Sequence, residues 1–223
     1  MKDVKLGLRL LKFGYGVKGM GVCAVAVFLL SIPLCAVSML KAINVPAGYF
    51  LLLAVFIPSQ GIISLCASDL VMASPVRKRL EVSIFVMMQF VGSVAAYLLL
   101  LAMGGVVAAR SPELIGHVSN QLLQTAVSAL CIELYAGACR KYMVASTVGF
   151  MILLLFSRTF FQNLFPELLL PVLGSGWELF AKAALLGLAL VLFGGGLMYL
   201  CNRALYRAPM SKLCQTAGLR KTL

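Results

Sequence analysis

The sequence predicts an all-α integral membrane protein with six transmembrane helices. Six apolar stretches have close to membrane-spanning length: residues 20–40, 48–72, 82–107, 119–138, 143–161 and 181–201. A bilayer core about 30 Å thick takes roughly 20 residues of helix to span. Of the 223 residues, 62% are hydrophobic and only 12% are charged. These polar side chains are too few to cover a soluble protein, so we expect the bilayer to be the solvent.

The basic residues are concentrated on one side of the predicted bundle and so orient it in the membrane. Fifteen of the 19 Lys and Arg residues precede span 1, follow span 6, or lie between spans 2 and 3 or spans 4 and 5. Cytoplasmic segments are the ones enriched in Lys and Arg, so we expect both termini in the cytoplasm and the chain in the plasma membrane. The net charge of +12 then reflects topology, with some attraction to anionic membrane lipid. No nucleic-acid partner is expected.

The chain divides into three predicted regions. Residues 1–18 form an interfacial amphipathic helix, because Lys2, Lys5, Arg9 and Lys12 fall on one side and apolar residues on the other. Glycines at its end predict a bend before the first span. Residues 19–203 form the six-helix transmembrane domain, and residues 204–223 form a basic cytoplasmic tail. The connections are short, so we expect no soluble domain within the chain.

The seven cysteines and the single histidine do not form a recognisable metal or redox motif. No cysteine falls in a predicted outer loop, and no pair has the spacing of a zinc site. His117 falls in a predicted outer loop and is interpreted as a solvated side chain. We expect no catalytic residue, metal site or cofactor in this chain. An intramembrane enzyme and a non-transporting membrane scaffold or immunity protein remain the alternatives to the function considered below.

Polar side chains inside the spans are costly and are therefore functional candidates. Glu133 is the only carboxylate well inside a predicted span. It is interpreted either as the partner of Arg140 or Lys141 near the cytoplasmic edge, or as a charge lining the inner mouth of a pathway for substrate. Five further side chains either form hydrogen bonds between helices or line the same pathway: Gln60, Gln89, Asn120, Gln121 and Gln124.

Small residues at four-residue spacing predict places where helices approach closely. The pairs are Gly92/Ala96, Ala145/Gly149 and Ala183/Gly187, and residues 194–196 are three consecutive glycines. Each of these faces can pack within one chain, so none identifies a dimer interface.

Two connections have an unusual composition. The inner one, residues 69–81, follows span 2 without a polar break, and its Pro75 forces a turn or starts a short helix. The outer one, residues 162–177, is apolar and contains Pro166 and Pro171. An apolar outer segment of this kind is expected to re-enter the membrane as a short helix buried against protein. Trp177 would then lie at the interface, where indole is favoured.

With these features the chain resembles the membrane (permease) subunit of ABC transporters of the ABC-2 exporter type. Those subunits have six spans with both ends inside, an interfacial helix before the first span, and a re-entrant segment between spans 5 and 6. Their inner loop after span 2 forms a coupling helix with a pattern close to Leu-apolar-apolar-Ser-Leu-Pro-Val-Ser-Arg. Residues 70–78 of this chain read Leu-Val-Met-Ala-Ser-Pro-Val-Arg-Lys. Leu70, Pro75, Val76 and the basic residues match, whereas Ser74 replaces a leucine and the serine after the valine is absent.

The resemblance implies a half-transporter of which two copies form the pathway. The chain has no Gly-x-x-x-x-Gly-Lys-Ser/Thr phosphate loop, so two cytoplasmic ABC ATPase subunits would bind ATP and Mg²⁺ and drive it. The basic triplet at 77–79 would pair with that partner or simply satisfy the positive-inside bias. The coupling surface would be Asp69, Met72, Ala73, Ser74, Pro75, Val76, Arg77, Lys78 and Arg79.

The expected activity is export of a hydrophobic or amphipathic substrate such as a peptide, a lipid-like molecule or a drug. Apolar walls with few charges suit such a substrate. Exporters of amphipathic peptide toxins in Gram-positive bacteria are one group that this chain resembles.

Overall fold

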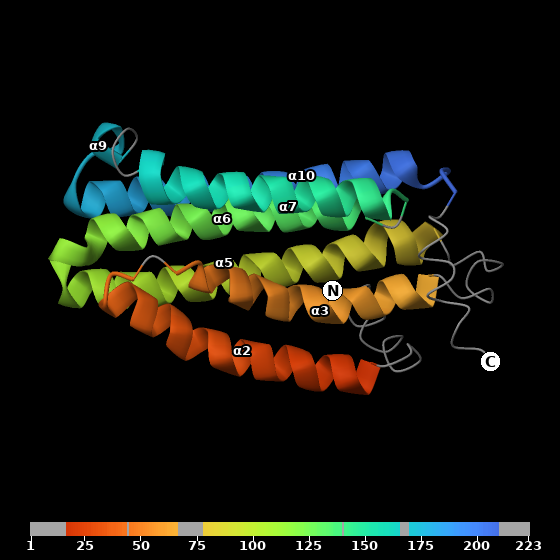
Figure 1. The fold of residues 1–223 in the computed structure, drawn as a ribbon, viewed down its shortest axis with the longest axis horizontal. Coiled ribbons are helices and arrows are strands. Elements are labelled where there is room, and N and C mark those ends of the chain that lie inside the picture. Colours follow the sequence, from red (N-terminus) through yellow and green to blue (C-terminus); the bar gives the residue numbers. More distant parts are fainter. Residues whose placement is uncertain (1–16, 44, 67–77, 140, 166–169, 210–223) are drawn as a thin grey trace.

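The computed structural model describes residues 17–43, 45–66, 78–139, 141–165 and 170–209. Six long helices run up and down through the molecule (Figure 1): α2 (Val17–Leu40), α3 (Ala47–Cys66), α5 (Phe85–Arg110), α6 (Ile115–Ala138), α7 (Met143–Thr159) and α10 (Gly176–Leu205). Four short helical segments join them: η1 (Arg79–Ile84), η2 (Pro112–Leu114), η3 (Phe160–Leu164) and α9 (Leu170–Leu173). The described residues contain no strand, which confirms the all-α class.

Each long helix coincides with one of the six predicted spans. Four described helices are long and apolar enough to cross a membrane: Gly19–Leu40, Arg79–Arg110, Met143–Asn163 and Gly176–Leu205. The apolar part of α3, Ala47–Gly61, is shorter. The remaining long helix, α6, carries several amides and Glu133 along its length.

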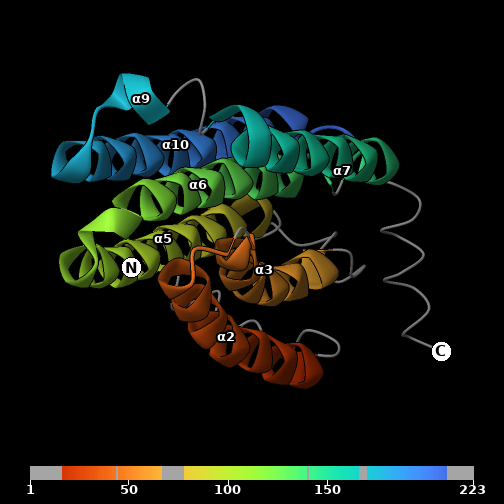
Figure 2. The ribbon, with the colours of Figure 1, turned by 60° about the vertical axis from the view of Figure 1, so that its left-hand side comes forward.

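Helix α6 forms the centre of the bundle. It packs most extensively against α10 and also contacts α5, α7 and α3. Figures 1 and 2 both place it between α5 and the α7–α10 pair, with α2 at the edge of the bundle. Seventeen of its 24 residues are buried, and seven of these are polar or charged. Neighbouring helices rather than lipid therefore surround the polar side chains of α6, which explains how a comparatively polar helix occupies this position.

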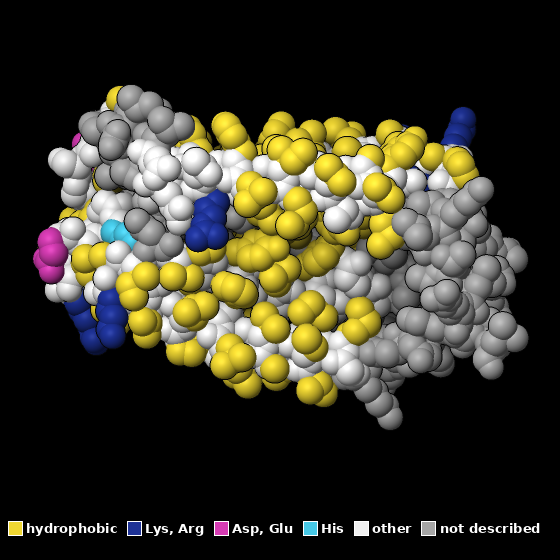
Figure 3. All heavy atoms as spheres, in the orientation of Figure 1, with side chains coloured by type: hydrophobic (Ala, Val, Ile, Leu, Met, Phe, Trp, Pro, Cys, Tyr) yellow, Lys and Arg dark blue, Asp and Glu magenta, His cyan; other side chains and the backbone are white. Residues whose placement is uncertain are grey.

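The outer surface has the apolar character that a membrane protein needs. In Figure 3, hydrophobic side chains cover the middle of the visible face, while most charged side chains lie toward its ends. Large apolar side chains are widely exposed on the outer helices, among them Leu30 (71%), Leu155 (63%), Phe156 (67%) and Leu185 (70%). In water such a surface would cause aggregation, whereas in a bilayer lipid chains cover it.

The small-residue pairs behave differently from one another. A Cβ at Gly92 would lie 2.1 Å from the side chain of Val55, and a Cβ at Gly187 would lie 2.0 Å from the Tyr97 hydroxyl. At both places helices of one chain pack in contact with the glycine. A Cβ at Gly149 would meet nothing within 4 Å, and Ala145 is exposed. The Ala145/Gly149 pair therefore makes no close helix contact within the described chain.

The ends of the molecule and its outer segment depart from the expected boundaries. Residues 1–16, the expected interfacial helix, and 210–223, most of the expected tail, lie outside the described residues, and α2 already begins at Val17. In Figure 1 the start of α2 and the end of α10 lie at the same end of the bundle. Helix α10 begins at Gly176, five residues before the predicted span. Residues 162–165 and 170–177 of the expected re-entrant segment are described, and they include the end of η3, the short helix α9 and the start of α10. Trp177 is half exposed and packs edge-on against Phe180.

Candidate functional site

A buried ion pair joins three connections at the end of the bundle where α2 begins and α10 ends. Glu81 lies in η1 and Lys141 in the α6–α7 connection, and their side chains are only 1% and 3% exposed. The Lys141 Nζ atom lies 4.0 Å from the Glu81 carboxylate and donates a hydrogen bond of 2.5 Å to the backbone carbonyl of Ala208, just beyond α10. We call Glu81, Lys141 and Ala208 the inner junction. It fixes the start of α5 to both of the other connections at this end.

The inner junction includes the described end of the predicted coupling loop. Segment η1 is a π-helix whose Leu80, Val82 and Ile84 side chains are buried, and it contacts α3, α5 and α10. π-helical turns are rare and are frequent at functional sites. Of the predicted coupling residues, Lys78 and Arg79 are described, and both are exposed. Asp69, Met72, Ala73, Ser74, Pro75, Val76 and Arg77 lie outside the described residues.

The structure does not form the Glu133–Lys141 pair that the sequence suggested. Lys141 binds Glu81 instead, and Arg140 lies outside the described residues. Glu133 is fully buried, and neither of its carboxylate oxygens has a hydrogen-bond partner in the described part of the chain. The Ser93 hydroxyl is directed toward it across the α5–α6 contact, but not with the geometry of a hydrogen bond. Gly194 of α10 provides the space, since a Cβ there would lie 2.2 Å from the Glu133 Oε2 atom.

Glu133 lies at one end of a buried polar chain that crosses three helices. The Ser59 hydroxyl of α3 donates to the Gln89 Oε1 atom of α5 at 2.9 Å, and the Gln89 Nε2 atom donates to the Ser93 hydroxyl at 3.3 Å. Ser59, Gln89 and Ser93 are each at most 1% exposed. We call these three residues together with Glu133 the polar seam. Of the two interpretations of Gln89, the structure shows the hydrogen bond between helices. Gln60 follows Ser59 in the sequence, and its side-chain nitrogen has no hydrogen-bond partner among the described residues.

A second polar cluster lies at the opposite end of the bundle. The Gln121 Nε2 atom of α6 donates to the Ser38 hydroxyl of α2 and, at 3.1 Å, to the backbone carbonyl of Ile43. The His117 Nε2 atom lies 3.0 Å from the same amide nitrogen and 3.2 Å from the backbone carbonyl of Ser38. Gln121 therefore ties α6 to the α2–α3 connection.

The interpretation of His117 as a solvated loop residue is wrong. The residue lies in the first turn of α6 and its side chain is half-buried between α6 and the end of α2. Sequence reasoning ended the loop at 118 because the first turn of α6 is polar. The helix begins earlier because Ser38 and Ile43 supply hydrogen-bonding groups at that depth.

The remaining predicted polar residues lie on the buried side of α6. The Asn120 side chain donates to the Phe161 carbonyl in the π-helical turn η3 at 3.1 Å, while its Oδ1 atom has no partner among the described residues. Gln124 is buried as well. Residues that sequence reasoning did not single out complete both polar regions, namely Ser38, Ser59, Glu81 and Ser93. A lone serine or a glutamate beside three basic residues carries no local sign of burial, so only the packing identifies them.

The described side chains form hydrogen bonds and an ion pair between helices, together with one buried acid, Glu133, that has no hydrogen-bond partner among them. No three His, Cys, Asp or Glu side chains come together within the described ranges. Of the described cysteines, Cys23, Cys35, Cys131 and Cys201 are free thiols. No family model, curated protein or solved structure matches this chain.

Proposed function

We propose that this chain is the membrane-embedded permease subunit of an ATP-driven exporter of the ABC-2 type. Two copies form the pathway, and two copies of a separate cytoplasmic ABC ATPase, which bind ATP and Mg²⁺, drive it. The chain lies in the plasma membrane with both termini in the cytoplasm. Its substrate is hydrophobic or amphipathic, of the class of peptides, lipid-like molecules or drugs.

The inner junction is the observation that carries this proposal. A permease without its own ATPase has to receive force through an inner connection and pass it to its helices. The sequence predicts that the loop at 69–81 is this connection. At the described end of the loop, Glu81 pairs with Lys141, and Lys141 also donates a hydrogen bond to the Ala208 carbonyl. A displacement of η1 therefore acts directly on the α6–α7 connection and on the end of α10. Separating a buried charge from its partner costs several kcal/mol, so these three connections move together.

Topology supports the same proposal. The described helices alternate in direction, and both the first and the last long helix have their chain-terminal ends at the end of the bundle that holds the inner junction (Figure 1). Among the described residues that end carries Lys78, Arg79, Lys141, Arg203 and Arg207. Under the six-span topology the full sequence has 15 of its 19 Lys and Arg on this side, which is the distribution expected of a cytoplasmic side.

The polar seam offers a place for substrate discrimination within the pathway. Glu133 is a buried acid whose carboxylate oxygens have no hydrogen-bond partner among the described residues, so opening the α6–α10 contact would expose a negative charge to the substrate. Under this proposal, Glu133→Gln weakens export of cationic substrates relative to neutral ones. An equal effect on both substrate classes would contradict it and leave Glu133 with a structural role. Gln60, Gln89, Gln121 and Gln124 remain candidate pathway residues, although Gln89 and Gln121 already hold helices together.

The central experiment tests coupling to an ATPase. The tagged full-length chain is purified from its native membrane, and we expect an ABC ATPase to co-purify and its hydrolysis in proteoliposomes to depend on this chain. Met72→Asp and Val76→Asp should abolish co-purification or stimulation, because a buried unpaired charge at an interface costs several kcal/mol. Ala204→Asp is the matched control, since Ala204 is exposed near the same end of the bundle but belongs neither to the loop nor to the inner junction.

The alternatives predict different results in this experiment. An intramembrane enzyme would be active alone in detergent, and a scaffold or immunity protein would neither retain an ATPase nor act alone. Topology is tested separately with single cysteines placed at Ser74 and Ser111 in a cysteine-free variant. These should react with impermeant thiol reagents from opposite sides, and labelling of both from outside would refute the six-span arrangement.

A further inference from the structure

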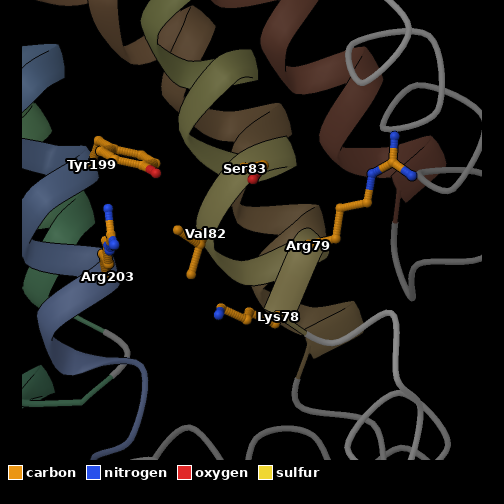
Figure 4. Close-up of a pocket in the computed structure, with 6 residues that line it drawn as sticks. All are labelled: Lys78, Arg79, Val82, Ser83, Tyr199 and Arg203. Carbon is orange, nitrogen blue, oxygen red and sulfur yellow. The ribbon is translucent and has the colours of Figure 1, made fainter.

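A basic groove opens between η1 and the last turns of α10. It has a volume of about 510 Å³ and is lined by Lys78, Arg79, Val82, Ser83, Tyr199 and Arg203. Figure 4 shows Lys78 and Arg203 on the two sides of the space between the helices, with the Tyr199 ring above Arg203. Arg79 points away from α10 in the same view. Two cationic side chains from elements far apart in sequence thus flank one cavity.

The chemistry of the lining selects an anion. Lys78 and Arg203 supply charged donors, and Ser83 and Tyr199 supply hydroxyl groups. Among the described residues that line the groove there is no carboxylate, and Glu81, the described acid nearest in sequence, is buried against Lys141. A phosphate group carries several oxygens that accept hydrogen bonds from ammonium, guanidinium and hydroxyl donors at once. Among common anions, phosphate therefore matches this set of donors best.

The groove continues into the membrane-facing surface of α10. Arg203, Tyr199, Gly196 and Leu192 recur at helical spacing and so share one face. Tyr199 is 40% and Leu192 48% exposed, and Gly196 has open space at its Cβ position. This face has a cation at its inner end, a tyrosine next to it and apolar surface beyond, which is the order of polarity along a phospholipid from headgroup to acyl chain.

We propose that this groove binds the phosphate group of an anionic ligand and that a membrane phospholipid supplies it. Lys78 and Arg203 contact the phosphate oxygens, the Ser83 and Tyr199 hydroxyls donate to the same headgroup, and an acyl chain lies along Gly196 and Leu192. Lipid binding at this site requires neither the ATPase nor transport. It can therefore be confirmed or refuted independently of the function proposed above.

The test measures ligand-dependent thermal stability of the full-length chain in a neutral detergent. The added probes are phosphatidylglycerol, phosphatidylcholine, sn-glycerol 3-phosphate and inorganic phosphate. The variants are Lys78→Gln and Arg203→Gln, whose side chains are exposed, so that folding is retained. Arg207→Gln is the matched control, because Arg207 is an exposed cation at the same end of α10 that does not line the groove.

We expect phosphatidylglycerol to raise the melting temperature of the unsubstituted chain and of Arg207→Gln alike. Lys78→Gln and Arg203→Gln should each require about tenfold more of this lipid, the loss expected when a charge-assisted hydrogen bond is removed. Arg203→Lys should recover part of the effect because it keeps the charge but not the planar fork of donors.

The other outcomes decide the source of the phosphate or refute the site. An equal shift with sn-glycerol 3-phosphate or inorganic phosphate would retain the phosphate site but replace the lipid with a soluble ligand. An equal loss in Arg207→Gln would show that overall positive charge attracts the lipid, and would overturn the groove as a site. The absence of any shift with all four probes would overturn it as well.

Discussion

Gly187→Ala should destabilise the bundle far more than Gly196→Ala, although both substitutions add one methyl group to the same helix. Gly187 lies where α10 packs against α5. A Cβ at this position would lie 2.0 Å from the Tyr97 hydroxyl oxygen, 2.7 Å from Cζ and 3.1 Å from Cε2. The Tyr97 ring cannot move aside freely, because it is fully buried and its hydroxyl donates to the Ala184 carbonyl at 3.1 Å. A Cβ at Gly196 would meet nothing within 4 Å.

The size of the difference follows from two local costs. Forcing a methyl group into a packed contact costs about 1–3 kcal/mol, and displacing the ring gives up a hydrogen bond worth about 1 kcal/mol. Alanine also gains about 1 kcal/mol over glycine in a helix, but both variants share this gain. Gly187→Ala should therefore be less stable than Gly196→Ala by roughly 2–4 kcal/mol. For a chain of this size that corresponds to a melting temperature lower by about 4–16 °C.

The buried cysteines provide a direct assay. Cys35 is fully buried and Cys131 is 5% exposed, so a thiol-reactive dye reports unfolding of the purified chain as it is heated in detergent. A double variant, Gly187→Ala with Tyr97→Leu, isolates the contact, because a leucine side chain ends short of the methyl group. Most of the cost of Gly187→Ala should then disappear. Equal melting temperatures for the two glycine variants, or strict additivity in the double variant, would refute the predicted packing of α5 on α10.

Three further predictions concern the polar residues. Glu133→Gln should leave the free energy of unfolding unchanged or raise it, because neither carboxylate oxygen has a hydrogen-bond partner in the described part of the chain. Chemical denaturation in detergent measures this free energy, and a loss of more than about 1 kcal/mol would contradict the prediction. Glu81→Gln and Lys141→Gln should each cost about 3–5 kcal/mol as single variants, since each leaves a buried charge without its partner, and the double variant should recover much of that loss. Gln121→Leu should cost about 1–3 kcal/mol and speed hydrogen exchange in the α2–α3 connection, because it removes the bonds to Ser38 and Ile43; unchanged exchange there would exclude this role.

The polar residues of α6 show where local pattern stops being informative. Sequence reasoning identified Glu133 and Gln121 as costly inside a membrane and left open whether they act in the pathway or in packing. In the structure, Gln121 donates a hydrogen bond to the Ile43 carbonyl, and Lys141 forms its ion pair with Glu81. Neither result could be predicted, because which helices become neighbours is a property of the whole bundle. The same reason explains the three consecutive glycines of α10, where Gly194 meets Glu133, Gly195 meets Phe90 and Gly196 faces open space.

The sequence by itself predicted six long helices and their approximate positions along the chain, although not the first residues of α6 and α10. Apolar length is a local quantity, and the bilayer sets a minimum for it, so spans can be counted one at a time. Only the tertiary structure decided that α6 occupies the centre, that His117 belongs to it, and that Glu81, Lys141 and Ala208 meet at the end of the bundle where α10 ends. These facts depend on contacts between residues far apart in the chain. If one helix shifts against its neighbour, the side-chain partners across that contact change, although the residues that make up each helix stay the same.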